Sequence, residues 1–137
     1  MRNDFPTLLA GFGTCAPATA EAIADCERRL QWKLPADYIK LLALTNGGEG
    51  FLGDGGYLVL WPIEELAAMN EEYEIWLYLP GFVSFGGNGG GEGYAYDIRS
   101  SQIAIVQFPF IGMEPEVVIP LASDFSGFLK RVRDNSY

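Results

Sequence analysis

The spacing of apolar residues along this chain changes sharply after Gly47, and the change limits the folds that the chain can adopt. Up to Asn46-Gly47, apolar residues recur every three or four positions, which is the spacing of one face of a helix. After Gly47, short apolar or alternating runs predominate, and glycine or proline bounds them, as is typical of strands. A last helical pattern closes the chain. Helices and strands segregated in this way predict an α+β fold with a mainly antiparallel sheet.

Three main helices and a shorter one are expected. The first covers 19–32, and the second has Pro35 in its first turn and ends at Asn46-Gly47, which tolerate the left-handed backbone of a helix C-cap. A short helix begins at Pro62, among the strands, and the closing helix has Ser123 as its N-cap. The segments expected as strands are 57–61, 82–85, 94–97, 103–108 and 116–120. The sheet should therefore hold about five or six strands, with the C-terminal helix packed on it.

The length and composition of the chain fit one domain that covers residues 1–137. A chain of 137 residues is short for two domains, and 49% of its residues are apolar, which suffices for a core. No apolar run approaches the roughly 20 residues that a membrane helix needs, and the N-terminal segment lacks the pattern of a secretory signal. We therefore expect a cytoplasmic protein without a membrane partner.

The chain contains no histidine, which limits the chemistry available to it. The absence removes Ser-His-Asp and Cys-His catalysis, histidine-ligated zinc and the usual general base near neutral pH. Two cysteines, Cys15 and Cys26, are too few for a structural zinc site without histidine, and we expect both to be reduced thiols. The missing histidine therefore weakens the case for catalysis, and we expect no metal or cofactor.

The net charge of −9 comes from one segment of the chain. Nine acidic residues and no lysine or arginine lie between Lys40 and Arg99, whereas acids and bases balance in the rest of the chain. An acidic segment of this kind could serve solubility alone, or it could form a face that meets a basic surface. We expect no nucleic-acid partner, because its phosphates would be repelled.

Residues 85–97, FGGNGGGEGYAYD, hold six of the seventeen glycines. A P-loop needs a lysine after its last glycine and a dinucleotide fingerprint needs a following helix, whereas Tyr94 and a strand-like pattern follow here. Glu92 would also repel phosphate. Calcium-binding glycine repeats work by stacking and this segment occurs once, although Glu92 and Asp97 could supply oxygen ligands. The segment therefore predicts a crossing between two strands, where glycine permits positive φ and close backbone approach.

Acidic and aromatic residues gather just before this crossing. Adjacent carboxylates such as Glu64–Glu65 could serve acid–base catalysis if one were desolvated, but on a short helix they are typical of a solvated face. Among the aromatic residues, Phe82 is expected in the core. Trp76 and Tyr78 fit a core and an exposed interface anchor about equally well.

The order of these features resembles one known family. A helix with a glutamate, a Leu-Pro-x-x-Tyr step and a helix that ends in Asn-Gly are similar to the opening of the SUKH superfamily, which includes the domain of the yeast cell-wall synthesis regulator and many bacterial relatives. A strand followed by a short helix, a glycine loop before a strand, and a closing helix complete the likeness over residues 19–132. Trp32 departs from it, where glycine is common, and so does the aromatic and acidic loop after Glu71. The residues at the motif positions are Glu27, Leu34, Pro35, Tyr38, Asn46, Gly47, Gly91, Asp97 and Phe125.

The resemblance implies a non-enzymatic protein-binding domain. Bacterial SUKH proteins are mostly inferred to be immunity proteins that neutralise toxins, often nucleases. A nuclease presents a positive face to its substrate, so the acidic middle segment suits a basic toxin domain as the partner. Two alternatives stay open, namely a regulatory or scaffolding domain that binds a host protein, and a small hydrolase that uses carboxylates. The expected partner-binding residues are Asp54, Glu64, Glu65, Glu71, Glu72, Glu74, Trp76 and Tyr78.

Overall fold

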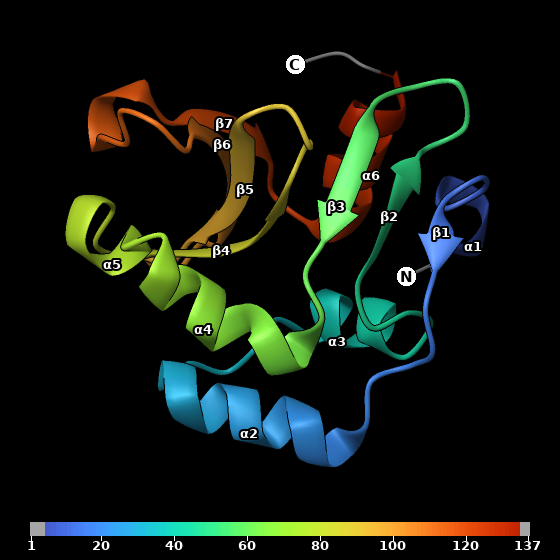
Figure 1. Ribbon diagram of the computed structural model, residues 1–137, viewed down its shortest axis with the longest axis horizontal. Helices are drawn as coiled ribbons and strands as arrows, with labels where there is room; N and C mark the ends of the chain where they lie inside the picture. Colours follow the sequence, from blue (N-terminus) through green and yellow to red (C-terminus); the bar gives the residue numbers. More distant parts are fainter. Residues whose placement is uncertain (1–4, 135–137) are drawn as a thin grey trace.

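A single antiparallel sheet runs through the computed structural model, which describes residues 5–134 (Figure 1). Its seven strands lie in the sheet in the order in which they occur along the chain, so each strand pairs with the next. The strands are β1 (Gly13–Thr14), β2 (Gly48–Phe51), β3 (Tyr57–Leu60), β4 (Phe82–Gly87), β5 (Glu92–Asp97), β6 (Ala104–Pro109) and β7 (Ile119–Ala122). The helices are α1 (Phe5–Leu8), α2 (Ala20–Leu30), α3 (Ala36–Leu42), α4 (Ile63–Glu72), α5 (Ile75–Tyr78) and α6 (Phe125–Asp134), with a 3-10 turn at Pro115–Val117.

The α+β fold with its antiparallel sheet, N-terminal helices and C-terminal helix is confirmed, and the strand count is higher than expected. The difference comes from β1 and β2, which no hydrophobic pattern indicates. β2 reads Gly-Glu-Gly-Phe, and Gly48 and Gly50 have φ values of +125° and +154°. A Cβ atom at Gly48 would lie 2.4 Å from the carbonyl oxygen of Gly13. This strand therefore depends on close backbone approach to its neighbours and not on its own side chains.

Three expected boundaries are wrong, and the structure contains one helix that the sequence did not predict. The second helix, α3, ends at Leu42, and Asn46 and Gly47 lie in the turn that follows it. The N-cap of α6 is Asp124 and not Ser123, because Asp124 Oδ1 accepts a hydrogen bond from the Gly127 amide at 2.7 Å. The last strand begins at Ile119, because Pro115–Val117 forms the 3-10 turn. Helix α5 was not expected, since a single turn carries too little periodicity to detect.

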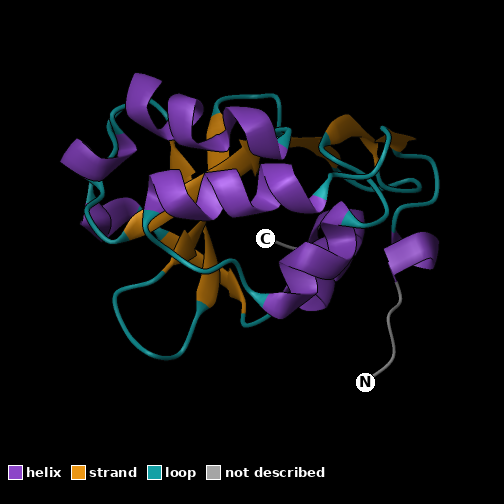
Figure 2. Cartoon of the chain, turned by 90° about the horizontal axis from the view of Figure 1, so that it is seen from below, coloured by secondary structure: helices purple, strands orange, loops and turns teal. Residues whose placement is uncertain are grey.

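The helices bury their apolar faces against each other and against the sheet. Helices α2 and α4 lie side by side and pack against each other (Figure 2). Helix α6 packs on β7, α1 and α3. Between α6, α3 and the sheet, the ring of Phe85 lies 5.2 to 6.5 Å from five other aromatic rings. Those rings belong to Tyr38, Tyr94, Tyr96, Phe125 and Phe128. Phe82 is buried in a second cluster with Ile75 and Leu79, as expected.

The two thiols are predicted to react at very different rates. Cys15 is exposed and Cys26 is buried on the inner face of α2, and both are free cysteines. Burial raises the pKa of the Cys26 thiol to about 11, so at pH 8 its thiolate fraction falls about a hundred-fold below that of an ordinary cysteine. A disulfide-exchange reagent should therefore modify Cys15 quickly and Cys26 only when the chain unfolds. Two fast-reacting thiols in the native chain, or one in Cys15→Ser, would contradict this placement.

Candidate protein-binding surface

Four of the predicted contact residues lie on one face of α4. Glu64 and Glu65 occupy its first turn and Glu71 and Glu72 its last, and all four are exposed. Positions seven apart lie on the same side of a helix, so the two pairs form one acidic stripe about 10 Å long. The opposite face of the helix packs inward through Ile63, Leu66, Ala67 and Asn70.

Side-chain hydrogen bonds to other segments hold α4 near both of its ends, one from Asn46 outside the helix and one from Asn70 within it. At the start, Asn46 Oδ1 accepts a hydrogen bond from the Ile63 amide at 2.7 Å, and its Nδ2 donates to Glu64 Oε1. Asn46 thus acts as an N-cap supplied from another segment, where Pro62 has no side-chain donor or acceptor. Near the other end, Asn70 reaches β4 and bonds both the amide and the carbonyl of Ser84 at 2.8 Å. The acidic stripe is therefore carried on a helix held at both ends.

Replacing Asn46 by alanine should lower the free energy of unfolding by about 1 to 2 kcal/mol, because a helix cap is lost. Glu64→Ala removes only the exposed Asn46–Glu64 bond and should change stability by less than about 0.5 kcal/mol. Urea unfolding followed by circular dichroism measures both values. Equal effects of the two substitutions would show that the Asn46–Ile63 bond does not carry the stabilisation.

Helix α5 presents a row of large apolar side chains to solvent. Glu74, with φ of +57°, separates it from α4. The single turn buries Ile75 and the following Leu79 completely, one helical repeat apart. The three residues between them therefore point outward, and the exposed fractions are 42% for Trp76, 66% for Leu77 and 49% for Tyr78. Trp76 and Tyr78, whose exposure the sequence left open, are both accessible.

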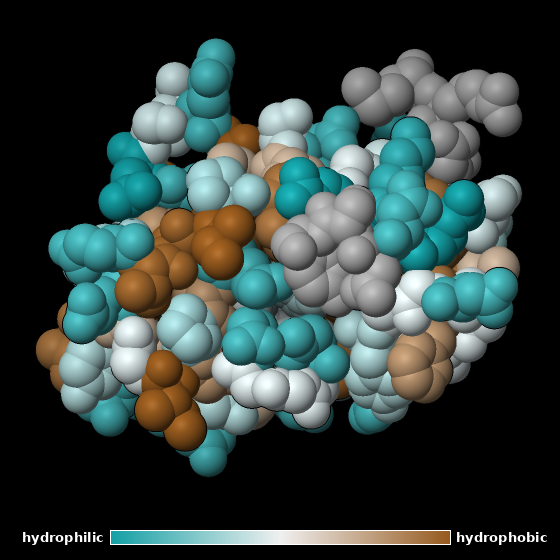
Figure 3. Space-filling model, turned by 90° about the horizontal axis from the view of Figure 1, so that it is seen from above, coloured by the Kyte–Doolittle hydropathy of each residue, from teal (hydrophilic) through white to brown (hydrophobic). Residues whose placement is uncertain are grey.

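The structure places Trp76 and Tyr78 in different surroundings. Tyr78 lines a hollow of about 590 Å³ with Phe110 and Met113, beside Ile111, which is 93% exposed. Trp76 lines another hollow, of about 350 Å³, with residues that include Leu30 of α2 and Phe82 of β4. Figure 3 shows hydrophobic side chains gathered on the left half of the face seen from above, the side on which α5 and the β6–β7 connection lie in Figure 1.

We define the α5 patch as Leu77, Tyr78 and Ile111. Along the chain, Glu71, Glu72 and Glu74 precede Leu77, and Glu114 follows Ile111. Leu77 and Ile111 were not predicted as contact residues, because the sequence pattern of an apolar residue in a short run is the same whether the residue is buried or exposed. Ile111 lies in the β6–β7 connection, and only the folding of the chain brings it to the α5 side of the molecule. Surface exposure of three neighbouring large apolar side chains is the feature that marks such a position as a contact surface.

Asp54 does not lie with the other predicted contact residues. It sits at the tip of the β2–β3 hairpin, beside the C-terminal end of α6, where the Gly56 amide bonds the Val132 carbonyl. Figure 1 shows this hairpin at the far side of the molecule from α5. The acidic segment is thus divided between two separate regions of the surface, and only the part on α4 and α5 adjoins the α5 patch.

The glycine-rich segment forms the β4–β5 hairpin, as expected, and no helix follows it. Gly89 and Gly91 have φ values of +77° and +109°, a conformation that favours glycine. Asn88 fixes the turn, because its Oδ1 accepts from the Gly90 and Glu92 amides and its Nδ2 donates to Glu92 Oε1. Glu92 therefore serves the turn itself.

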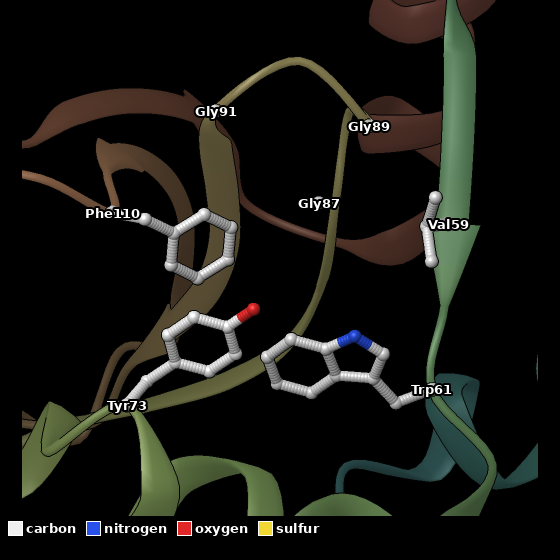
Figure 4. Close-up of a pocket in the computed structure, with 7 residues that line it drawn as sticks. All are labelled: Val59, Trp61, Tyr73, Gly87, Gly89, Gly91 and Phe110. Carbon is white, nitrogen blue, oxygen red and sulfur yellow. The ribbon is translucent and has the colours of Figure 1, made fainter.

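A third, smaller hollow lies between this hairpin and β3 (Figure 4). It has a volume of about 290 Å³. The rings of Trp61, Tyr73 and Phe110 line one part of it, and Val59 and the backbone of the hairpin line the rest. Beside the hollow, β3 and β4 pair at Val59 with Gly87 and at Leu60 with Gly86, and the Trp61 amide donates to the Phe85 carbonyl.

The residues of the family-like motif join elements of the scaffold. Glu27 Oε2 accepts a hydrogen bond from the Leu34 amide at 2.8 Å, which fixes the turn between α2 and α3 before Pro35. Tyr38 is buried and stacks on Phe125 with ring centroids 5.6 Å apart. Asp37, between these positions, accepts a hydrogen bond from the Phe125 amide at the start of α6. These contacts support structural roles within the helical half of the chain.

The remaining motif positions lie where the sheet meets its connections. Gly47 has φ of +83°, and a Cβ atom there would lie 2.8 Å from the Leu60 carbonyl oxygen. Asp97 pairs with Arg99 at 2.9 Å, and the Arg99 guanidinium lies 4.6 Å above the ring of Phe82. Arg99 lowers the pKa of the Asp97 carboxyl, chiefly through a side-chain hydrogen bond. Gly91 supplies the positive φ of the hairpin.

No arrangement in the described residues favours hydrolysis by paired carboxylates. Glu49 and Glu65 line one hollow near Cys15, but both side chains are exposed, and a catalytic acid of this kind needs a desolvated carboxyl. No group of three or more potential metal ligands occurs within residues 5–134. Across the same residues, no helix is long and apolar enough to cross a membrane.

One antiparallel sheet and the helices packed on it define a small α+β protein, and its surface exposes large apolar side chains close to acidic ones. The chain belongs to the SMI1 / KNR4 family (SUKH-1), whose family model matches residues 17–131. No curated protein matches the chain. The family match confirms the resemblance inferred from the motifs, and membership fits an immunity-like or regulatory domain.

Proposed function

We propose that this chain is an immunity protein that binds and neutralises a basic toxin domain, in the cytoplasm and without catalysis of its own. The observation that carries the proposal is the α5 patch beside the acidic end of α4. The exposed fractions of Leu77, Tyr78 and Ile111 are 66%, 49% and 93%, values that leave large apolar areas uncovered in the isolated chain. Binding would occlude the partner one-to-one.

The two parts of this surface would act differently. Apolar and aromatic side chains at the centre of an interface slow dissociation, because they are fully desolvated in the complex. The carboxylates of Glu71, Glu72 and Glu74 are exposed around the centre, where charges chiefly speed association with an oppositely charged partner. A nuclease toxin is a suitable partner because its substrate-binding face must be positive to hold phosphates.

Reversing the charge of the acidic rim tests this surface. The triple variant Glu71→Lys, Glu72→Lys and Glu74→Lys should lower the association rate constant for the partner at least tenfold at low salt, and the difference should shrink as salt is added. Surface-based kinetics with the partner recovered by co-purification measures the rate. The matched control reverses three exposed acids elsewhere, Glu21, Asp54 and Asp134, and so has the same net charge.

Equal association rates for the rim variant and the control variant would reject the α4–α5 surface. Co-purification also separates the two kinds of partner that the family allows. If the recovered partner is a secreted toxin, the immunity function is supported. If it is a protein of the cell's own machinery, the regulatory or scaffolding function is supported in place of immunity.

A further inference from the structure

The hollow beside the glycine hairpin has an aromatic side and a backbone side. The rings of Trp61 and Tyr73 are nearly parallel, with an interplanar angle of 3° and centroids 5.9 Å apart. The ring of Phe110 stacks on Tyr73 at 4.5 Å. In Figure 4 the Tyr73 hydroxyl and the Trp61 ring nitrogen both point toward Gly87 on the opposite side. The hollow therefore offers flat π-faces together with polar atoms and side-chain-free backbone.

The charges around this hollow are negative. Residues 41–129 contain one basic residue, Arg99, and its guanidinium is held by Asp97 and Phe82. Acidic residues adjoin the lining residues along the chain or across the sheet: Glu72 and Glu74 are the sequence neighbours of Tyr73, Glu92 follows Gly91, and Glu49 is the register partner of Val59. The Glu92 carboxylate accepts a hydrogen bond from Asn88 and the Glu49 carboxylate one from Tyr57. A cation is favoured at such a position both by the carboxylates and by the faces of the rings.

We propose that this hollow receives an arginine side chain of the protein partner. A guanidinium is planar and weakly hydrated, so it stacks on the Trp61 and Tyr73 rings while its N–H groups donate to the Tyr73 hydroxyl and to glycine carbonyls. The Trp61 indole N–H can donate to a main-chain carbonyl of the same partner segment. A volume of about 290 Å³ is at the lower end of the usual range for small-molecule sites and has room for one side chain. The inference rests on the proposed function, because it names the partner group that the domain recognises.

The test uses the isolated chain and small probes, so it needs no partner. In ¹⁵N-labelled protein, N-acetyl-arginine methylamide should shift the Trp61 indole signal and the Gly87, Gly89 and Gly91 amides in a saturable way at millimolar concentration. The citrulline derivative has the same length and no charge, and it should bind about tenfold more weakly or not at all. The lysine derivative should be weaker by a few fold, since an ammonium cannot stack as a plane.

A pair of variants separates the hollow from the rest of the surface. Tyr73→Leu should weaken the arginine probe about tenfold. Phe51→Leu, which changes an exposed aromatic residue outside this hollow and outside the α5 patch, should leave its affinity unchanged. Tyr73 is 38% exposed, so Tyr73→Leu should still fold. The same spectra show whether it does.

Three outcomes would overturn the inference: equal binding of the arginine and citrulline probes, tighter binding of N-acetyl-phenylalanine methylamide, or unchanged arginine binding by Tyr73→Leu. Failure of the proposed function has a different signature. Saturable arginine binding in the hollow, together with equal association rates of the rim and control variants, keeps the hollow and rejects the α4–α5 surface. If the arginine probe does not bind but the rim variant associates much more slowly than the control variant, the inference about the hollow is rejected and the α4–α5 surface is kept.

Discussion

Replacing Asn70 by leucine is expected to lower the free energy of unfolding by about 3 kcal/mol. Asn70 is fully buried, and its side-chain amide bonds the Ser84 amide, the Ser84 carbonyl and the Leu66 carbonyl, each at 2.8 Å. Leucine has a similar size but offers no donor or acceptor. Ser84 N–H and C=O would then be buried without partners, and each unpaired group costs about 1 to 3 kcal/mol.

The expected cost is high because Asn70 occupies a position that a strand would normally fill. β3 pairs with β4 only at Gly86 and Gly87, and β5 lies on the other edge of β4. At Ser84, which adjoins a β-bulge, the amide group of Asn70 takes the place of the missing neighbour. Few other side chains could do this, since both a donor and an acceptor are needed at one point.

Urea unfolding measures the loss, with Ala68→Leu as the control. Ala68 lies on the exposed face of the same helix, so leucine there should change stability by no more than about 0.5 kcal/mol. If Asn70→Leu and Ala68→Leu unfold at the same urea concentration, the Asn70–Ser84 bonds do not hold α4 on the sheet.

The sequence predicted the parts of the fold that follow from periodicity or from turn chemistry. The amphipathic pattern of 19–32 gave α2, Asn-Gly marked a turn, and the glycine-rich segment gave the β4–β5 hairpin. Burial of Phe82 also followed from its place in an apolar run. These features are local, because each depends on residues that are neighbours along the chain.

The features that the sequence could not predict depend on contacts between distant segments. β1 and β2 are two and four residues long, and close backbone approach defines them, which leaves no hydrophobic pattern. Asn46 and Asn70 look like ordinary polar residues, although each completes the hydrogen bonding of another element. Ile111 sits in a connection, and only the fold brings that connection to the α5 side of the molecule.

The same distant contacts make the candidate surface rigid. α4 is fixed at its start by Asn46 and near its end by Asn70, and α5 is anchored by the buried side chains of Ile75 and Leu79. The exposed residues of α4 and α5 can therefore vary without loss of the helices that carry them. A surface that is already ordered before binding loses less conformational entropy in the complex, so more of its contact energy appears as affinity.

The double variant Tyr78→Ala and Ile111→Ala is expected to weaken partner binding by about 3 kcal/mol, more than a hundred-fold. Both side chains are exposed in the isolated chain, at 49% and 93%, so their truncation should leave the free energy of unfolding within about 0.5 kcal/mol of the original. Affinity and stability would then be separated, which a scaffold substitution such as Asn70→Leu cannot do.

The loss should appear in dissociation, because truncating central apolar contacts shortens the life of a complex and leaves diffusional encounter unchanged. Kinetics with the recovered partner should show a dissociation rate constant raised about a hundred-fold, with an association rate constant near the original. The charge-reversed rim variant should show the opposite division between the two constants. The matched control, Phe51→Ala, removes a side chain that is 58% exposed on β2, away from α5, and should change neither constant. A double variant that binds like this control would place the interface centre elsewhere than the α5 patch.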